Sequence, residues 1–243
     1  MIEIDRKILC FKKKEIWFSP GPFDVKGYDH VTFHFCSQAS SLPGFQMAES
    51  NTFGIDLNRD LNVIWEQLDQ TTRHQITRAR QNGVKVRVNQ DYEEFMELNR
   101  RFRESKELHR FQVPMEEMKR HGVLFVSFID DKMQGGQLYL EDDKNMRQVI
   151  SVSRRLEVDK DQGKYIGYGN KLLVWEAICH AKKAGKVFFD LGGYSDEPQL
   201  LGAKQFKAGF SKDVYKSYKY NKTYNKAFDT ARGFYRFLKR IKI

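Results

Sequence analysis

The thirty residues from 164 to 193 constrain the fold of this chain more than any other stretch. Gly167 and Gly169 come before an apolar run of helical period that ends at Gly185, the usual helix terminator. Residues 187–191 are then predicted to form a short buried strand. A glycine turn that leads into a helix exposes backbone N–H groups at the positive end of the helix dipole. This pattern predicts an anion site, but a tight loop entering an ordinary core helix would use the same glycines.

The segment Lys164-x-x-Gly167-x-Gly169 is similar to the Arg/Gln-x-x-Gly-x-Gly/Ala loop of the GNAT acyltransferases, which binds the phosphates of acyl-coenzyme A. The segments that resemble the FemAB-like branch of that superfamily, in order and spacing, are residues 65–68, 73–84, 175–185, 189–193 and 206–210. The resemblance covers about residues 56–220. The residues that it assigns to the phosphates of the donor are Lys164, Gly167, Tyr168, Gly169 and Asn170.

The predicted elements follow one another in the order of the GNAT fold. A helix starts at its N-cap, Asp60, and ends near Gly83, and Asp91 and Pro114 open two more helices. The strands predicted after residue 57 are 84–88, 123–129, 134–140, 146–158, 187–191, 200–210 and 214–220. We therefore expect an α+β fold, with a GNAT-like mixed, mostly antiparallel sheet flanked by helices. A ligand is expected where neighbouring strands separate beside the glycine turn.

Three parts are expected along the chain. A strand-rich N-terminal segment covers residues 1–56, a GNAT-like acyltransferase domain covers 57–222, and a basic C-terminal helix covers 223–243. The short β runs predicted in the first part are residues 7–11, 15–18 and 30–35.

The net charge of +10 is concentrated at the C-terminal end of the chain. Residues 199–243 hold twelve Lys and Arg side chains and two acidic ones, so the rest of the chain is balanced. Phe234, Phe237 and Ile241 follow helical spacing with basic residues between them, as in a helix that lies on an anionic membrane. Residues 228–243 are therefore a candidate membrane contact, although a helix docked on its own domain has the same spacing. tRNA is a second, less favoured partner.

The sequence contains no run of eighteen apolar residues, and its N-terminus lacks the apolar stretch of a signal peptide. We expect a cytoplasmic protein, peripheral on the inner face of the membrane if residues 228–243 bind lipid. The three cysteines lie far apart, and the six histidines lack ligand spacing. The sequence therefore predicts neither a disulfide framework nor a metal site.

Acyl transfer to an amine needs a bound donor, a neutral amine, hydrogen-bond donors for the oxyanion and an acid for the leaving group. The sequence has no Gly-x-Ser-x-Gly segment and no cysteine in a reactive setting, which favours direct attack by the amine over an acyl-enzyme. The candidate catalytic residues are Asp190, Lys207, Tyr168 and Tyr194. The candidate substrate-binding residues are Gly192, Gly193, Lys204, Phe206, Arg73 and Arg78.

Each candidate also has a structural explanation. Asp190 could act as a base, or it could accept backbone N–H bonds of the Gly192-Gly193 turn. Lys207 is preferred because the resemblance assigns a lysine at this position to the transition-state charge or to a phosphate. The tyrosines could protonate a leaving group or only pack. The two arginines could bind an anionic acceptor or remain solvated charges.

The leading hypothesis is an N-acyltransferase that moves an acyl group from acyl-coenzyme A to an amine on a cell-envelope precursor. The acceptor would be an amino sugar, as in polysaccharide biosynthesis, or a peptidoglycan peptide. An aminoacyl-tRNA-dependent transferase for peptidoglycan cross-bridges is the second hypothesis. The third is a non-catalytic protein that binds nucleic acid or a membrane through residues 199–243. The tyrosines that could stack on bases, or pack across strands, are Tyr215, Tyr218, Tyr220 and Tyr224.

Overall fold

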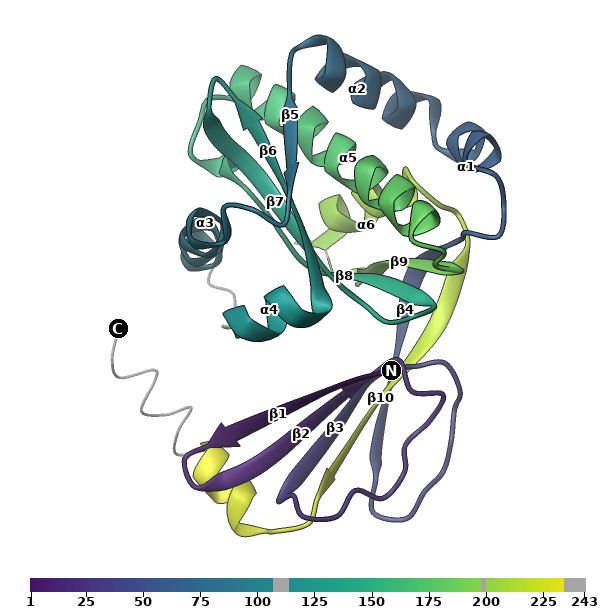
Figure 1. Ribbon diagram of the computed structural model, residues 1–243, viewed down its shortest axis with the longest axis vertical. Helices are drawn as coiled ribbons and strands as arrows, with labels where there is room; N and C mark the ends of the chain where they lie inside the picture. The colour runs from purple at the N-terminus through teal and green to yellow at the C-terminus, as the bar shows by residue number, and fades with distance from the viewer. Residues whose placement is uncertain (107–113, 198–199, 234–243) are drawn as a thin grey trace. The chain divides into compact units, whose positions relative to one another are not determined.

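The computed structural model of the protein describes residues 1–106, 114–197 and 200–233 (Figure 1). The chain forms two compact units. The larger unit is Thr52–Val214, and the smaller one combines the residues up to Asn51 with the described residues from Tyr215 onward. The chain passes from one unit to the other within two strands, β4 (Gln46–Asp56) and β10 (Val214–Thr223). The predicted divisions, after residues 56 and 222, lie further along the same two strands.

The smaller unit is a sheet built mainly from the N-terminal residues. β1 (Ile2–Ile8) pairs antiparallel with β2 (Phe11–Trp17), β2 pairs parallel with β3 (His30–Cys36), and β3 pairs antiparallel with β10. The fully buried side chains of its core include Ile16, Val31, Phe33 and Tyr220. The predicted strand-rich N-terminal segment is confirmed.

The β run predicted at residues 7–11 is wrong. Leu9 and Cys10 form the turn between β1 and β2, and Leu9 adopts a positive φ of 56°. Non-glycine residues seldom adopt this conformation, and the apolar residues on both sides of the turn hide it in the sequence. β4 was not predicted, because its first half is polar and exposed.

The described start of the C-terminal segment packs on its own unit. Phe228 is fully buried, with its ring centroid 5.9 Å from that of Phe11 and 4.7 Å from that of His30. Burial lowers the pKa of His30 to about 4. Residues 234–243 of the predicted membrane contact lie outside the described residues. Within the described part of the chain, no helix is long and apolar enough to cross a membrane.

The larger unit contains a mixed sheet in the strand order β4, β9, β8, β7, β6, β5. The bounds of its further strands are β5 (Lys85–Val88), β6 (Gly122–Ile129), β7 (Lys132–Glu141), β8 (Asn145–Ser153) and β9 (Phe188–Gly193). Neighbouring strands are antiparallel except for β8 and β9, which are parallel. The predicted α+β fold with a mixed, mostly antiparallel sheet is confirmed.

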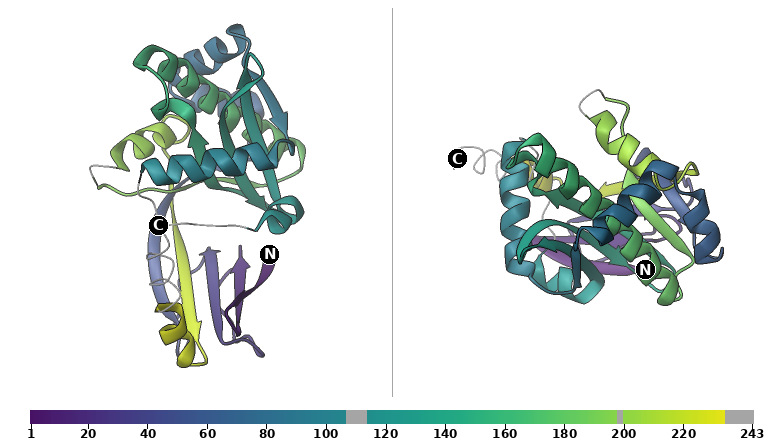
Figure 2. Two further views of the ribbon diagram at one scale, coloured as in Figure 1. Left: turned by 90° about the vertical axis from the view of Figure 1, so that its left-hand side faces the viewer. Right: turned by 90° about the horizontal axis from the view of Figure 1, so that it is seen from above.

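Helices cover both faces of this sheet. They are α1 (Leu61–Gln67), α2 (Gln70–Gln81), α3 (Tyr92–Ser105), α4 (Met115–His121), α5 (Lys160–Lys183) and α6 (Leu201–Ala208). Side chains alternate between the faces along β6. Val123 and Phe125 pack with residues of α1, α2 and α5, whereas Leu124 and Val126 pack with α3 and α4. Figures 1 and 2 accordingly show α5 and α3 on opposite sides of the sheet.

Three predicted elements of the larger unit are corrected by the structure. The helix from Asp60 is interrupted at Leu68 and Asp69, which separate α1 from α2. The β run predicted over residues 146–158 ends at Ser153 and is followed by a 3-10 turn. The strand predicted over residues 200–210 is instead α6, because the Leu, Ala, Gln and Lys residues of this segment favour a helix.

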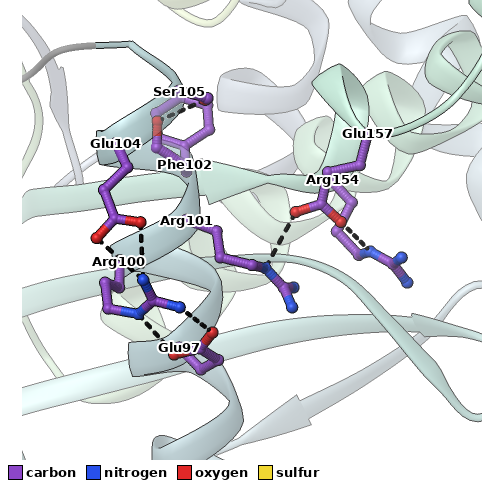
Figure 3. A network of polar contacts seen from close by, with 8 residues as sticks. All are labelled: Glu97, Arg100, Arg101, Phe102, Glu104, Ser105, Arg154 and Glu157. Carbon is purple, nitrogen blue, oxygen red and sulfur yellow. Dashed lines mark hydrogen bonds and ion pairs between the residues drawn. The ribbon is translucent and has the colours of Figure 1, made fainter.

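A network of exposed ion pairs joins α3 to the turn that precedes α5 (Figure 3). Arg100 pairs with a glutamate on either side of it along α3, at 2.6 and 2.7 Å. Arg101 of α3 and Arg154 of the turn both pair with Glu157, at 3.2 and 2.8 Å. These contacts lie in water, where each ion pair stabilises little.

Candidate functional site

Arg147 and Asp190 form a buried ion pair between β8 and β9. The parallel register places the two residues side by side, and Arg147 Nη1 donates to Asp190 Oδ2. Their side chains are only 4% and 9% exposed. Sequence reasoning missed Arg147, although a charged residue inside an apolar β run is itself a signal of a paired charge.

The other carboxylate oxygen of Asp190 holds the end of β9. The predicted Gly192-Gly193 turn is the irregular end of this strand, beside a shift in its register with β4. The hydroxyl of Thr52, on β4, donates to Oδ1, and so does the backbone N–H of Gly192, at 2.7 Å. Each oxygen of Asp190 thus accepts at least one hydrogen bond. This arrangement favours the structural explanation of Asp190, as the anchor of the turn, over the predicted role as a base.

Lys207 brings an ammonium group from α6 to the Gly192-Gly193 turn. Its Nζ donates to the carbonyl oxygen of Gly193 at 2.6 Å. Burial lowers the pKa of Lys207 to about 8; the charge of Arg147 acts in the same direction, and Asp190 opposes both. Gly192 has a φ of 87°, and a Cβ there would lie 3.1 Å from Lys207 Nζ. Both the backbone and the lysine therefore require glycine at this position.

The pairing of β8 with β9 is short. Among the described residues it runs from Asn145 and Phe188 to Arg147 and Asp190, although both strands continue beyond that point. β8 also has a bulge at Val149 against β7. The Gly192-Gly193 turn and Lys207 thus lie just beyond the last pair, where β8 and β9 are no longer paired, whereas the sequence predicted the ligand beside Gly167 and Gly169.

Tyr194 follows the same turn and Lys204 lies against its ring, whereas Phe206 contacts Phe210, with ring centroids 5.6 Å apart. Tyr194 stacks on Phe53 with a centroid distance of 4.6 Å, and Lys204 Nζ lies 5.0 Å from the centre of the Tyr194 ring. Lys204 is paired with Asp196, which raises the pKa of this lysine. Of the predicted cations, Lys207 is therefore the one that contacts the turn without a carboxylate bonded to it.

The predicted glycine turn is wrong, because Gly167 and Gly169 lie inside α5. The helix begins at Lys160 behind its N-cap, Asp159, whose carboxylate accepts the N–H groups of Asp161 and Gln162 at 3.0 and 2.9 Å. The exposed helix N–H groups therefore lie several residues before the glycines, next to two acidic side chains. These residues do not fit a pyrophosphate held by backbone N–H groups, as the resemblance had implied.

The remaining predicted donor-binding residues lie along α5. A Cβ on Gly169 would meet Ser127 and Val84 at 3.7 Å, an ordinary contact distance, and a Cβ on Gly167 would meet no atom within 4 Å, so packing does not require glycine at either position. The backbone oxygen of Asn170 accepts a bond from Gln137 at 3.0 Å. Tyr168 makes an edge contact with Tyr165. Lys164 is exposed. None of these contacts, among the described residues, involves the Gly192-Gly193 turn.

The two predicted arginines of α2 are not part of the turn region. Arg73 donates to the carbonyl oxygens of Glu66 and Leu68, at 2.6 and 3.2 Å, and so caps the end of α1. Arg78 is exposed. The structure thus supports the structural explanation for Arg73. In residues 1–106, 114–197 and 200–233, no group of three His, Cys, Asp or Glu side chains could hold a metal ion.

No protein-family model and no curated protein matches this sequence. Solved structures do match. FemX has 10% identity and a TM-score of 0.61, over 93% of this chain and 85% of that one. The C-terminal domain of a putative lysylphosphatidylglycerol synthetase from Agrobacterium fabrum has 14% identity and a TM-score of 0.54, over 84% and 70%. L-PGS from Bacillus licheniformis has 13% identity and a TM-score of 0.51, over 87% and 73%. These likenesses show that this chain shares its fold with the three proteins, and they confirm the predicted mixed fold.

Proposed function

We propose that the protein is an N-acyltransferase and that Lys207 supplies the cation at its reacting centre. The observation that carries this proposal is the ammonium group of Lys207 on the Gly193 carbonyl, just beyond the last pair of β8 and β9. The likeness to the folds of FemX, of the lysylphosphatidylglycerol synthetase domain and of L-PGS supports it. No covalent acyl-enzyme is needed, since a neutral amine can attack the acyl carbon directly.

Lys207 suits the charge that develops in such a reaction. When the amine attacks, the carbonyl oxygen gains negative charge, and that charge then passes to the leaving group. With a pKa of about 8, Lys207 is mostly protonated at neutral pH and yet gives up its proton readily. We infer that the ammonium stabilises the oxyanion and protonates the leaving thiolate or alkoxide, and that the proton lost by the attacking amine then reprotonates the neutral lysine. Asp190, whose oxygens are engaged, holds the turn in place.

Substitution of Lys207 tests this assignment. Lys207→Met should lower kcat by about a hundredfold, the usual effect of removing one oxyanion donor. Lys85→Met, at an exposed position of β5, is the matched control and should retain full activity. The proposal fails if Lys207→Met transfers acyl groups at the rate of the unsubstituted protein.

The structure changes which acyl donor is favoured. Acyl-coenzyme A was favoured because of the glycine turn, but that segment is helical. This observation favours the second candidate, an aminoacyl ester of tRNA, together with the positive charge of residues 199–243. Thermal unfolding with coenzyme A and, separately, with aminoacyl-tRNA distinguishes the two, because a ligand of the folded state raises Tm. A rise with coenzyme A alone would eliminate the tRNA donor.

For the acceptor we propose an amine of a cell-envelope precursor, either an amino sugar or a peptidoglycan peptide. The name of the lysylphosphatidylglycerol synthetase, whose product is a lysylated membrane lipid, supports a cell-envelope acceptor in general. Product analysis by mass spectrometry, with each acceptor offered singly, tests it. The non-catalytic hypothesis loses one of its stacking tyrosines, since Tyr220 is fully buried and bonds the backbone of Gln38 and Ser40.

A further inference from the structure

The helix that carries Lys207 contributes little to the core. None of the eight described residues of α6 is buried, and only Phe206 and Ala208 pack partly against the core cluster. A helix of this length is marginal in water without tertiary contacts. Its N-cap residue, Leu200, has no side-chain group that could bond the first N–H groups. The contacts at its C-terminal end must therefore fix its position.

The start of α2 holds the backbone at that end. The N–H of Asp69 donates to the carbonyl oxygen of Gly209 at 3.0 Å. Lys212 Nζ donates to the carbonyl oxygen of Ala208 at 2.9 Å and pairs with the carboxylate of Asp69 at 3.0 Å. Two of the last carbonyl groups of α6 thus have partners, as a helix end requires.

Lys171 reaches the same end from α5. Its Nζ donates to the hydroxyl of Thr72, on α2, at 2.8 Å, and lies 6.0 Å from the centre of the Phe206 ring. It also lies 3.7 Å from the place that a Cβ on Gly209 would take. Burial lowers the pKa of Lys171, whereas Asp69 favours its charged form. The carbonyl end of α6 and the face of Phe206 both attract a cation at this position.

The fit between the three helices is close. A Cβ on Gly209 would lie 2.5 Å from the Thr72 hydroxyl oxygen, so α6 approaches α2 as nearly as a glycine allows. Thr72 is buried, and α2 and α5 are themselves fixed in the core, for example through Ile76 and Leu172. The junction therefore ties the exposed α6 to two well-packed helices.

We propose that Lys171 and Thr72 are positioning residues that hold α6 by its C-terminal end and so place Lys207 Nζ on the Gly193 carbonyl. They act through Gly209 and Phe206 and do not touch the reacting atoms. The inference rests on the proposed acyl transfer for its functional meaning. The placement of Lys207 can nevertheless be measured without any activity.

The experiment measures the titration of Lys207 by competitive acetylation with acetic anhydride over a pH series, read by mass spectrometry. In the unsubstituted protein the midpoint should lie near 8, as burial beside Arg147 and Asp190 dictates. Lys171→Met should move it towards the ordinary value of 10.5 and lower kcat about tenfold, with the KM for the amine within about twofold. Lys171→Arg should restore most of both. Lys183→Met, exposed on the same helix, should change neither.

An unchanged Lys207 midpoint in Lys171→Met overturns the inference, whatever the activity. If the protein shows no acyl transfer but the midpoint moves, the positioning stands and only the proposed function fails. Should Lys171→Met not fold, Thr72→Val decides, because it removes the hydroxyl and keeps the β-branched shape of the side chain. Thr72→Val should also raise the midpoint, and an unchanged midpoint in that variant overturns the inference equally.

Discussion

Two sets of ion pairs in the larger unit differ in how the chain holds them. Arg147 and Asp190 lie side by side on paired strands, and their side chains are 4% and 9% exposed. The network of Arg100, Arg101 and Glu157 on and beside α3 spans exposed positions, where long side chains make direct ion pairs at the surface (Figure 3). A buried charge that loses its partner is costly, whereas an exposed one is solvated. The comparison indicates that the stability of the fold depends on the buried pair that strand register places, and not on the number of exposed ion pairs.

Breaking the buried pair should have the largest effect. Arg147→Met leaves the carboxylate of Asp190 buried without its cation, and should lower the free energy of unfolding by about 3 to 5 kcal/mol. Urea denaturation measures it. The double variant Arg147→Met with Asp190→Asn should recover part of the loss, because no charge remains and the amide oxygen can still accept from Thr52 and Gly192. Equal losses in the single and double variants would show that the charge itself is not the cause.

A substitution in the turn that Asp190 anchors should have the next largest effect on the free energy of unfolding. Gly192→Ala places a Cβ 3.1 Å from Lys207 Nζ and 3.2 Å from the Gln148 carbonyl oxygen, at a φ of 87°. The strain should cost about 1 to 3 kcal/mol in the free energy of unfolding. Acyl transfer should fall as well, since Lys207 must move. Gly167→Ala is the matched control because it meets open space within α5, and it should be neutral or stabilising. Equal stability of the two variants would contradict the argument.

The titration of Lys207, which lies beside the buried pair, should appear in the pH dependence of stability. Its pKa is about 8 in the folded protein and close to 10.5 in the unfolded chain, which therefore binds more protons between these values. Over that pH range the free energy of unfolding should rise with pH on account of this residue. Lys207→Met should lose the rise, and the difference between the two stability curves measures it. A difference that is flat from pH 8 to 10.5 would refute the lowered pKa.

The exposed network should give the smallest effect. Arg101→Met removes one of the two cations on Glu157, and Arg154 remains to pair with it at 2.8 Å. We expect no change in the free energy of unfolding outside experimental error. Raising the salt concentration should leave this variant and the unsubstituted protein equally stable. A loss as large as that of Arg147→Met would remove the distinction between the two sets.

Much of the fold followed from periodicity, but the ends of elements did not. β6 and β7 were predicted to within two residues at each end, because their apolar residues continue up to hairpin turns that contain aspartate. α5 was predicted to start after Gly169, and it starts at Lys160. Two glycines looked like a loop, but the helix starts earlier, at the N-cap Asp159, and continues through both of them despite their low helix propensity.

The residues of the candidate site could be predicted where they lie in one segment of the sequence. They could not be predicted where they come from several segments. Asp190, Gly192 and Gly193 lie within four residues at the end of β9, and the two glycines could be recognised from the sequence. Lys207 depended on a family resemblance, since nothing local distinguishes it from other lysines. The partners Arg147 and Thr52 come from different strands, and only the strand register brings them to Asp190. Lys171 and Thr72 meet Gly209 through helix packing, which no sequence pattern encodes.

The lack of buried side chains in α6 also bears on how such a protein can change over generations. Exchanges at Leu201, Gly202, Ala203 or Gln205 leave the core untouched, so they should carry little penalty in stability. The same residues border the lysine that we assign to the reaction. Selection can therefore alter the surroundings of Lys207, and with them the choice of acceptor, while the scaffold that holds the lysine stays constant.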